Sequence, residues 1–448
     1  MNKSCQNARK VVAQLNIAGH EAYLVGGCVR DMVLGKAEIP DYDVCTSALP
    51  EQVKQVFAKT FDTGIKHGTV TVLHDGEPFE VTTYRIDGAY SDNRRPDEVH
   101  FTTDLIDDLK RRDFTFNAMA MDYEGRIVDP FNGQADLKNK VIRAVGDPNE
   151  RFREDPLRIL RGIRFLAQLG LEFSIDDDTL TAMSKQAHLL KSISAERIQV
   201  ELVKTVVAKN VWALKVASNA GITQHFLPEF DVAMACEQNN PHHAYTVGVH
   251  TLLTLESIAV DKVLRLAMLL HDVAKPACKT TGEDGIDHFY GHPEAGVEMA
   301  REILRRLKFD NDTIDKVKHL IRWHDYRPAP TPKSVRKAVA KIGEDYFPLY
   351  LQVRRADTAG QSDYERAEKL ATIDKIEKIF HDTIEAGVAT DLKKLAIDGH
   401  DLIDLGITRG PEIGRVLTEL LEIVLEDPEL NTREILIGKV NDFTKLEG

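Results

Sequence analysis

Two aspartates near the amino terminus have the spacing of a shared metal site. Asp41 and Asp43 are separated by one residue, and alternate side chains of an extended strand point to the same side. Two hard cations such as Mg²⁺ need a cluster of carboxylate oxygens of this kind. Glu80, in the alternating segment from Phe79 to Tyr84, is a candidate third carboxylate, although an exposed strand acid has the same pattern. Taken alone, so short a motif is more often a pair of solvated loop acids, so its interpretation depends on the rest of the chain.

Glycines and cations around this pair suit a triphosphate. Gly26 and Gly27 follow an apolar run and let the backbone approach phosphates closely, and Arg30 is placed to meet their charge. Further along the chain, two arginines stand beside an acid and an amide, a set that suits a triphosphate and a ribose hydroxyl. These residues are Arg111, Arg112, Asp113 and Asn117. A structural ion pair at a helix end would explain one of the two arginines equally well.

A second acid and arginine, Asp155 and Arg158, have the spacing of helix neighbours. Pro156 fits the first helical turn with Asp155 at the cap, so the two side chains would lie about one turn apart. A carboxylate accepts from an exocyclic amine and a guanidinium donates to ring nitrogens or carbonyls, so the pair could read the edge of adenine or cytosine. Helix capping and a salt bridge form the alternative. Arg161 and Arg164, which follow, are further candidates for nucleotide binding.

These motifs occur in the order typical of one family. GGCVRDMVLG followed by DYD, then RRDFTFNA and EDPLR, resembles the class II tRNA nucleotidyltransferases of the tRNA nucleotidyltransferase/poly(A) polymerase family. The resemblance implies template-independent addition of CCA, or part of it, to tRNA from CTP and ATP. It also implies Mg²⁺ held by Asp41 and Asp43 with Glu80, and bases read by Asp155 and Arg158. An enzyme that adds A alone and a bacterial poly(A) polymerase remain alternatives.

Two further segments match the same family. Residues 84–96 resemble its flexible loop, which helps to switch specificity between bases. The segment from Ser194 to Ile198 matches a neck motif of the family and resembles a helix start with a capping box. We expect this segment to be structural rather than catalytic.

A second set of candidate ligands occupies the other half of the chain. It contains His250, His271, Asp272, His292, His324 and Asp357. Imidazoles and carboxylates suit transition metals or Mg²⁺, and a metal so bound can activate water against a phosphorus centre. Each histidine alone would more often be an ordinary residue than a ligand. The adjacent pair His271 and Asp272 resembles the doublet of HD-domain phosphohydrolases, which implies a second, phosphoester-hydrolysing site.

Length and periodicity predict several modules. The chain has 448 residues, of which 43% are hydrophobic, enough for several cores. Its start alternates short strands with helices, and the remainder has apolar residues at helical spacing, as from Leu157 to Leu169, from Arg197 to Val207 and from Val263 to Leu270. We expect an α+β chain with a polymerase-β-like nucleotidyltransferase head that contains a small mixed sheet, followed by helical parts. The expected bounds are 1–145 for the head, 146–235 for an all-α neck, 236–388 for an HD-type helical domain and 389–448 for a helical tail that, by the resemblance, binds tRNA.

Charge and composition limit the partners, the location and the alternative functions that we expect for this protein. A net charge of −13 argues against indiscriminate nucleic-acid binding, although the arginines of 151–164 offer a local track for tRNA. The five cysteines form no CxxC pair, and no signal-peptide or transmembrane segment is evident, so we expect a cytoplasmic protein with no membrane association and no obligate protein partner. A chain that works mainly as an HD-type phosphohydrolase, and a non-catalytic tRNA-binding protein, are alternatives that the complete set of head motifs argues against.

Overall fold

The computed structural model describes residues 3–87, 99–407 and 410–446. Contacts between residues divide the chain into two compact units, Met1–Pro228 and Glu229–Gly448. Most of the predicted specificity loop, from residue 88 to residue 96, lies outside the described residues. Among the helices that the structure describes, none is long and apolar enough to cross a membrane.

The first unit is built on a mixed sheet, whose strand order within the described residues is β3-β4-β5-β2-β1-β8-β9. Strands β2 and β5 are parallel, and the other neighbours are antiparallel. The predicted alternation is confirmed in β5, which buries Phe79, Val81 and Thr83 and exposes Glu80. The strands of this unit are β1 (Ala22–Val25), β2 (Asp43–Thr46), β3 (Thr60–Gly64), β4 (Thr69–His74), β5 (Glu77–Thr83), β6 (Arg85–Asp87), β7 (Val99–Phe101), β8 (Ala120–Met121), β9 (Ile127–Val128), β10 (Val141–Ile142) and β11 (Ser174–Ile175).

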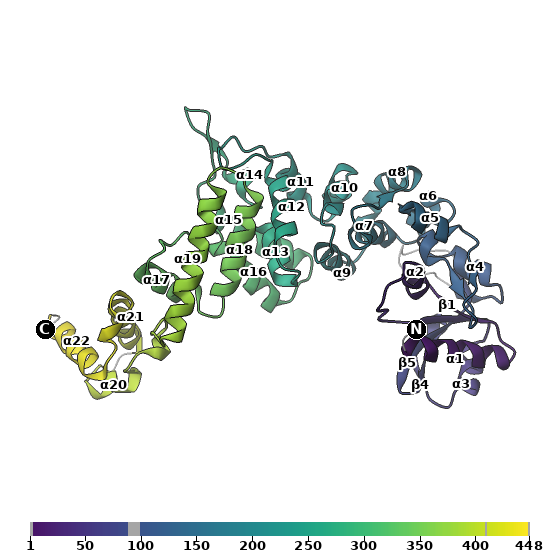
Figure 1. The fold of residues 1–448 in the computed structure, drawn as a ribbon, viewed down its shortest axis with the longest axis horizontal. Helices are drawn as coiled ribbons and strands as arrows, with labels where there is room; N and C mark the ends of the chain where they lie inside the picture. The colour runs from purple at the N-terminus through teal and green to yellow at the C-terminus, as the bar shows by residue number, and fades with distance from the viewer. Residues whose placement is uncertain (1–2, 88–98, 408–409, 447–448) are drawn as a thin grey trace. The chain divides into compact units, whose positions relative to one another are not determined.

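Helices cover this sheet and continue beyond it. They are α1 (Lys3–Ile17), α2 (Gly27–Val33), α3 (Pro50–Val56), α4 (Leu105–Lys110), α5 (Gly133–Asn139), α6 (Pro148–Glu154), α7 (Leu157–Leu169), α8 (Asp177–Gln186), α9 (Ala195–Val206) and α10 (Ala213–Asn219), with α11 (Pro228–Ala235) at the unit boundary. Helices α1 and α3 pack against the sheet, and α7 packs against α9 (Figure 1). This arrangement confirms the predicted α+β class with a polymerase-β-like head.

The helix predicted from the neck motif is present, but its capping box is not. Helix α9 begins directly after Ser194, whose side chain makes no capping hydrogen bond. The third helical position holds Arg197, a donor, whereas a capping box needs an acceptor there. The Ser194 carbonyl starts the helix by accepting from the Ile198 N–H at 3.2 Å.

The second unit is helical. Its helices are α12 (Val247–Ser257), α13 (Lys262–Leu270), α14 (Lys275–Cys278), α15 (His292–Arg306), α16 (Asn311–Trp323), α17 (Pro332–Ile342), α18 (Phe347–Gly360), α19 (Arg366–Glu385), α20 (Gly399–Asp404), α21 (Gly410–Glu426) and α22 (Arg433–Leu446). A short hairpin joins β12 (Thr280–Thr281) to β13 (Asp287–His288). Helices α12, α13, α15, α16 and α18 pack together and carry the candidate metal ligands (Figure 1).

The carboxyl-terminal helices have a core of their own. Leu402, Leu420, Val424 and Leu436 are buried in one cluster. Buried Arg336 of α17 donates 2.9 Å hydrogen bonds to the last two carbonyls of α21, which ties the tail to the rest of its unit. The four-domain division expected from the sequence remains a prediction.

Candidate functional site

The acidic residues of the first unit meet on two neighbouring strands. Asp43 is the first residue of β2, and Asp41 precedes the strand. The parallel register pairs Val44 with Val81, so Asp43 and Glu80, each one residue earlier, lie on the same face. The pKa of Asp43 is raised, first by desolvation of its carboxyl group and then by the charges of Glu80 and Asp41, against the opposing effect of nearby Arg112. Mutual repulsion of this kind is what a divalent cation would relieve.

Both arginines of the RRD motif are held by one buried acid. Asp108 accepts from Arg111 Nε at 2.9 Å and Nη2 at 2.8 Å, and from Arg112 Nη2 at 3.1 Å. The structural ion pair expected for one arginine therefore exists for both. Gly26 has a φ of 77°, and a Cβ there would lie 3.1 Å from Arg112 Nη1, so a side chain at this position would crowd the guanidinium.

Asp113 lies at the centre of a hydrogen-bond network. It accepts from Arg161 Nε at 2.7 Å and from Asn117 Nδ2 at 3.1 Å, and Asn117 in turn accepts from Arg30 Nη1 at 2.9 Å. Burial alone would raise the pKa of Asp113, but Arg161 and Asn117 outweigh it and lower that pKa to about 2. Asp113 is therefore an anion at neutral pH that fixes the orientation of its partners.

Asp155 and Arg158 are close in the fold but are not paired with each other. Asp155 lies between α6 and α7, where Oδ1 caps the N–H of Leu157 at 3.1 Å and Oδ2 accepts from Arg197 at 2.8 Å. Arg158 donates to Glu154 Oε2 at 2.6 Å and to two backbone carbonyls. The expected cap is confirmed, whereas the expected pairing of the two is replaced by two separate partners, because Asp155 ends one helix rather than lying on α7.

Most of these groups line one cavity of about 480 Å³, whereas Asp41, Glu80 and Asp108 are not part of its lining. Its lining contains Gly26, Gly27, Arg30, Asp43, Arg111, Arg112, Asp113, Asn117, Asp155, Leu157, Arg158, Arg161, Arg164, Phe165, Gln168 and Arg197. Three guanidinium groups surround the Phe165 ring, with Arg164 at 4.3 Å from its centroid, Arg30 at 5.3 Å and Arg161 at 5.7 Å. Cations far outnumber anions along this wall, as binding of a polyanion requires.

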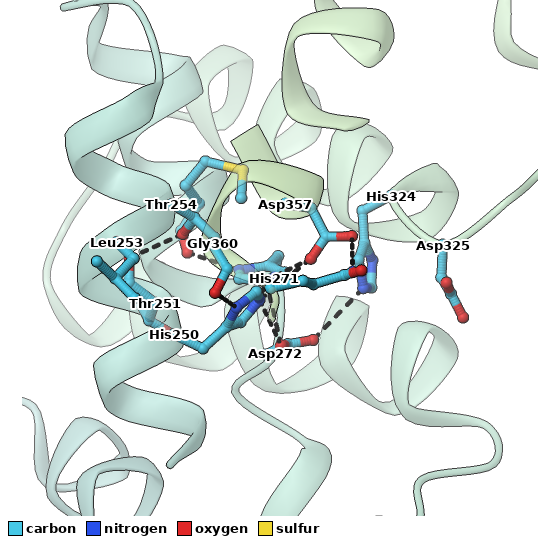
Figure 2. Close-up of polar contacts among 12 residues, drawn as sticks. His250, Thr251, Leu253, Thr254, His271, Asp272, His324, Asp325, Asp357 and Gly360 are labelled. Carbon is cyan, nitrogen blue, oxygen red and sulfur yellow. Dashed lines mark hydrogen bonds and ion pairs between the residues drawn. The ribbon is translucent and has the colours of Figure 1, made fainter. Parts of the chain in front are cut away.

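The six candidate ligands of the second unit converge on one point. Figure 2 shows His250, His271, Asp272, His324 and Asp357 pointing toward one another, while Asp325 stands apart. Asp272 is 1% exposed and lies between two histidine pairs. Its Oδ2 is 3.2 Å from His271 Nε2 and 3.5 Å from His250 Nε2. Its Oδ1 is 3.5 Å from Nε2 of both His292 and His324.

The four histidines present lone pairs rather than N–H groups to this centre. Each Nδ1 lies within 3.0 Å of a backbone carbonyl and so carries the proton, which leaves each Nε2 as an acceptor. His250 Nε2 and His271 Nε2 are 3.2 Å apart, and His292 Nε2 and His324 Nε2 are 3.1 Å apart. Two lone pairs repel at this distance, but two imidazoles bound to one metal at about 2.1 Å in tetrahedral geometry would be separated by roughly this much.

The charges in the cluster also suit a bound metal cation. The ammonium group of buried Lys275 faces Asp272 and stabilises its side chain as a carboxylate. Neither of its oxygens has a hydrogen bond of normal geometry among the described residues, although Lys275 Nζ lies 2.8 Å from Oδ2. Asp357 Oδ1 adds a further oxygen 3.1 Å from His250 Nε2. Two groups of ligands therefore share Asp272, and the residues present suit two metal ions.

Known proteins are similar to this chain over nearly its whole length. A CCA-adding enzyme of Levilactobacillus brevis is 35% identical over 451 residues, which cover 97% of this chain and 97% of that protein. The chain belongs to the CCA-adding enzyme family of tRNA nucleotidyltransferases. A family model described as the poly A polymerase head domain matches residues 22–143, and one described as a probable RNA and SrmB-binding site of polymerase A matches residues 172–234. A model of tRNA nucleotidyltransferase domain 2 matches residues 292–440.

Solved structures agree with this membership. The crystal structure of the Bacillus stearothermophilus CCA-adding enzyme in complex with CTP has a TM-score of 0.73 at 29% identity, covering 99% of this chain and all of that one. The Thermotoga maritima CCA-adding enzyme complexed with tRNA has a TM-score of 0.60 at 21% identity, covering 99% of this chain and 96% of that one, and shows a common fold. The enzyme class predicted from the sequence is therefore confirmed.

Several residues in or beside the first cavity escaped the sequence analysis. Asp108 looks like one of several acids in an ordinary helix, and Phe165 looks like a core residue. Arg197 was expected to be structural, but it contacts Asp155 and lines the cavity. Its place in a motif shared with the family was the one available signal. Asp108 lies three and four residues before Arg111 and Arg112, and this helical ion-pair spacing was its signal. Phe165 had no comparable signal, because Arg30 reaches its ring only in the folded unit.

Proposed function

We propose that this chain adds CCA, or part of it, to the 3′ end of tRNA from CTP and ATP, with release of pyrophosphate. The observation that carries this proposal is the single cavity in which Asp43, the arginine cluster and Asp155 with Arg158 come together. Members of its family that match the full length, such as the Levilactobacillus brevis protein, are named for this activity.

Asp41, Asp43 and Glu80 would hold two Mg²⁺ ions, which the clustered carboxylate oxygens of the two strands fit. When bound, the ions would lower the pKa of the terminal hydroxyl of the primer and neutralise the leaving pyrophosphate. The Arg111 and Arg112 guanidinium groups, oriented by Asp108, would bind the triphosphate.

Base selection would come from Asp155 and Arg158. Among the described residues, each Asp155 oxygen accepts one hydrogen bond, so lone pairs remain for an exocyclic amine. Arg158 uses Nη1 and Nη2 in its contacts within the fold, and a guanidinium has five N–H donors, so donors remain for a ring nitrogen or carbonyl. Such a pair would select adenine and cytosine without a nucleic-acid template.

The test uses tRNA that lacks its terminal CCA. Purified protein is incubated with this tRNA and labelled CTP and ATP, separately and together, and product lengths are resolved on a gel. Addition of three nucleotides with both substrates is the expected result. Addition of A alone to tRNA that already ends in CC would instead identify an A-adding enzyme, and long homopolymers of A would identify a poly(A) polymerase.

We further propose that the histidine and aspartate cluster of the second unit hydrolyses phosphoesters, with 2′,3′-cyclic phosphates or 3′-phosphates of damaged tRNA ends as candidate substrates. The two facing Nε2 pairs around Asp272 favour this second activity. A transition metal or Mg²⁺ held there would activate water for attack on phosphorus. Lys275, which lines the same cavity, would meet a substrate phosphate.

The second activity has its own test. Wild type and Asp272→Ala are assayed with Mn²⁺, Ni²⁺, Co²⁺ and Mg²⁺ on 2′,3′-cyclic AMP and on 3′-phosphorylated RNA, with exposed Asp312→Ala as a matched control. We expect hydrolysis to be lost only in Asp272→Ala and addition of CTP and ATP to persist in all three proteins. A wild type without bound metal and without hydrolysis of either substrate would refute this activity.

A further inference from the structure

The proposed metal-binding cluster, made of His250, His271, Asp272, His292, His324 and Asp357, is covered by a cavity of about 280 Å³. A separate side cavity lies next to it, between α18 and α19. Its volume is about 290 Å³, close to the lower end of ligand pockets. It is lined by Arg327, Pro328, Tyr350, Leu351, Arg354, Glu365, Glu368, Lys369, Thr372, Ile373 and Ile376. One part of this wall is apolar and aromatic, another carries carboxylates and a hydroxyl, and a third carries cations.

This side cavity adjoins the cavity over the cluster. Arg327 lines both. Arg354 reaches from one to the other, since its Nη1 donates to the His324 carbonyl at 3.2 Å and lies 3.7 Å from Asp357 Oδ2. Lys369 Nζ donates at 3.1 Å to Oε1 of Gln361, which lines the cavity over the cluster. The two cavities therefore meet at three cationic side chains.

The cations at this junction are suited to a phosphate group. Lys369 is held by neutral acceptors, Gln361 Oε1, His242 Nδ1 and the Tyr364 carbonyl. Its pKa is lowered, first by burial and then by the charge of Arg327, and the opposing effect of Glu365 is smaller. A phosphate between these groups would accept several charge-assisted hydrogen bonds and relieve the repulsion among them.

We propose that the side cavity is the nucleobase subsite of the second site, so that the substrates of this site are nucleoside phosphates. The base and ribose would lie against Tyr350, Leu351 and Ile373, and the phosphate would lie between the cationic junction and the metal-binding cluster. A base has two apolar faces and a polar edge, which matches an apolar wall with Glu368 on its rim as an acceptor for an exocyclic amine. This inference rests on the proposed hydrolase activity and names its substrate class.

The main test fills the side cavity. Thr372 is half-buried, and its hydroxyl donates to the Glu368 carbonyl of its own helix at 2.9 Å, so Thr372→Phe fills the cavity without removing a contact between helices. Exposed Ala371→Phe, outside the cavity on the same helix, is the matched control. Full-length protein loaded with Mn²⁺ is assayed on 2′,3′-cyclic AMP, on an RNA oligonucleotide with a 2′,3′-cyclic phosphate end and on base-free 1-O-methylribose 2,3-cyclic phosphate.

The readout is the ratio of kcat/KM for each base-containing substrate to kcat/KM for the base-free one. Because contacts with a base contribute substantially to nucleotide binding, we expect Thr372→Phe to lower this ratio about tenfold or more, through KM, and Ala371→Phe to leave it unchanged. Lys369→Gln should raise KM for all three substrates several-fold, whereas Lys375→Gln on the same helix should not. The wild-type ratio of RNA to 2′,3′-cyclic AMP identifies which source of nucleotide is preferred.

The outcomes separate this inference from the hydrolase proposal. If wild type hydrolyses all three substrates and Thr372→Phe leaves the ratio unchanged, the hydrolase stands and the subsite is refuted. If wild type hydrolyses none of them, the hydrolase is refuted, and photolabelling with 8-azidoadenosine 3′-phosphate decides the subsite. Label in peptides of residues 347–376 that is lost in Thr372→Phe would support a nucleotide site, and label elsewhere only would overturn it.

Discussion

Replacing Asp108 with asparagine should destabilise the first unit strongly. The Asp108 residue is 0% exposed, and it binds side chains of Arg111 and Arg112 that are 17% and 20% exposed. Removing one partner of a buried ion pair costs about 3–5 kcal/mol, because the other charge stays buried. Since both guanidinium groups keep some access to water, we expect the lower end, about 3 kcal/mol of unfolding free energy, and a loss of nucleotide addition as the two arginines lose their orientation.

Urea unfolding of the full chain, followed through the transition of the first unit, measures this loss. The adjacent, less buried Asp107→Asn is the matched control and should lose well under about 1 kcal/mol, as most partly exposed substitutions do. A loss below about 1 kcal/mol in Asp108→Asn, or equal losses in the two variants, would show that Asp108 does not hold the arginines as the structure indicates.

The same variant has a pH signature. Burial alone would raise the pKa of Asp108, but Arg112 and Arg111 outweigh it and lower that pKa. A carboxyl with a lowered pKa in the folded state stabilises the fold above its unfolded value of about 3.9, and this contribution disappears as pH falls through the folded-state pKa. The difference in stability between wild type and Asp108→Asn should therefore be largest near neutral pH and shrink in acid below about pH 4.

Three further predictions concern the parts of the proposed nucleotidyltransferase. Asp41→Asn or Asp43→Asn should abolish nucleotide addition while tRNA affinity, measured by filter binding, changes little; near-normal turnover would show that the carboxylates hold no essential metal. Asp155→Ala or Arg158→Ala should reduce discrimination of CTP and ATP against UTP and GTP about tenfold or more in competition assays, and unchanged selectivity in a folded variant would return both residues to a structural role. Truncation at Asp391 should weaken tRNA binding and lower the stability of the second unit, whose α17 loses its contacts with α21, but leave NTP affinity intact; equal loss of both affinities would point to global unfolding.

Local features of this protein were determined by the sequence alone. The apolar spacing predicted a helix from Leu157 to Leu169, where α7 begins and ends. Alternation in β5 placed Glu80 on the open face, because successive side chains of a strand point to opposite sides whatever the strand packs against. His271 and Asp272 are consecutive residues, so the sequence alone places them next to each other. Such features follow from backbone geometry over a few residues, which the order of amino acids sets directly.

Tertiary structure decided which of these groups work together. Arg197 is 42 residues from Asp155 in the chain, yet it holds that carboxylate, and Arg161 is 48 residues from Asp113, which accepts its hydrogen bond. The proposed metal-binding cluster takes its side chains from or beside α12, α13, α15, α16 and α18, and backbone carbonyls turn each histidine Nε2 inward. Partners of this kind depend on burial and helix packing, whose contacts join residues far apart in sequence, so no local spacing encodes them.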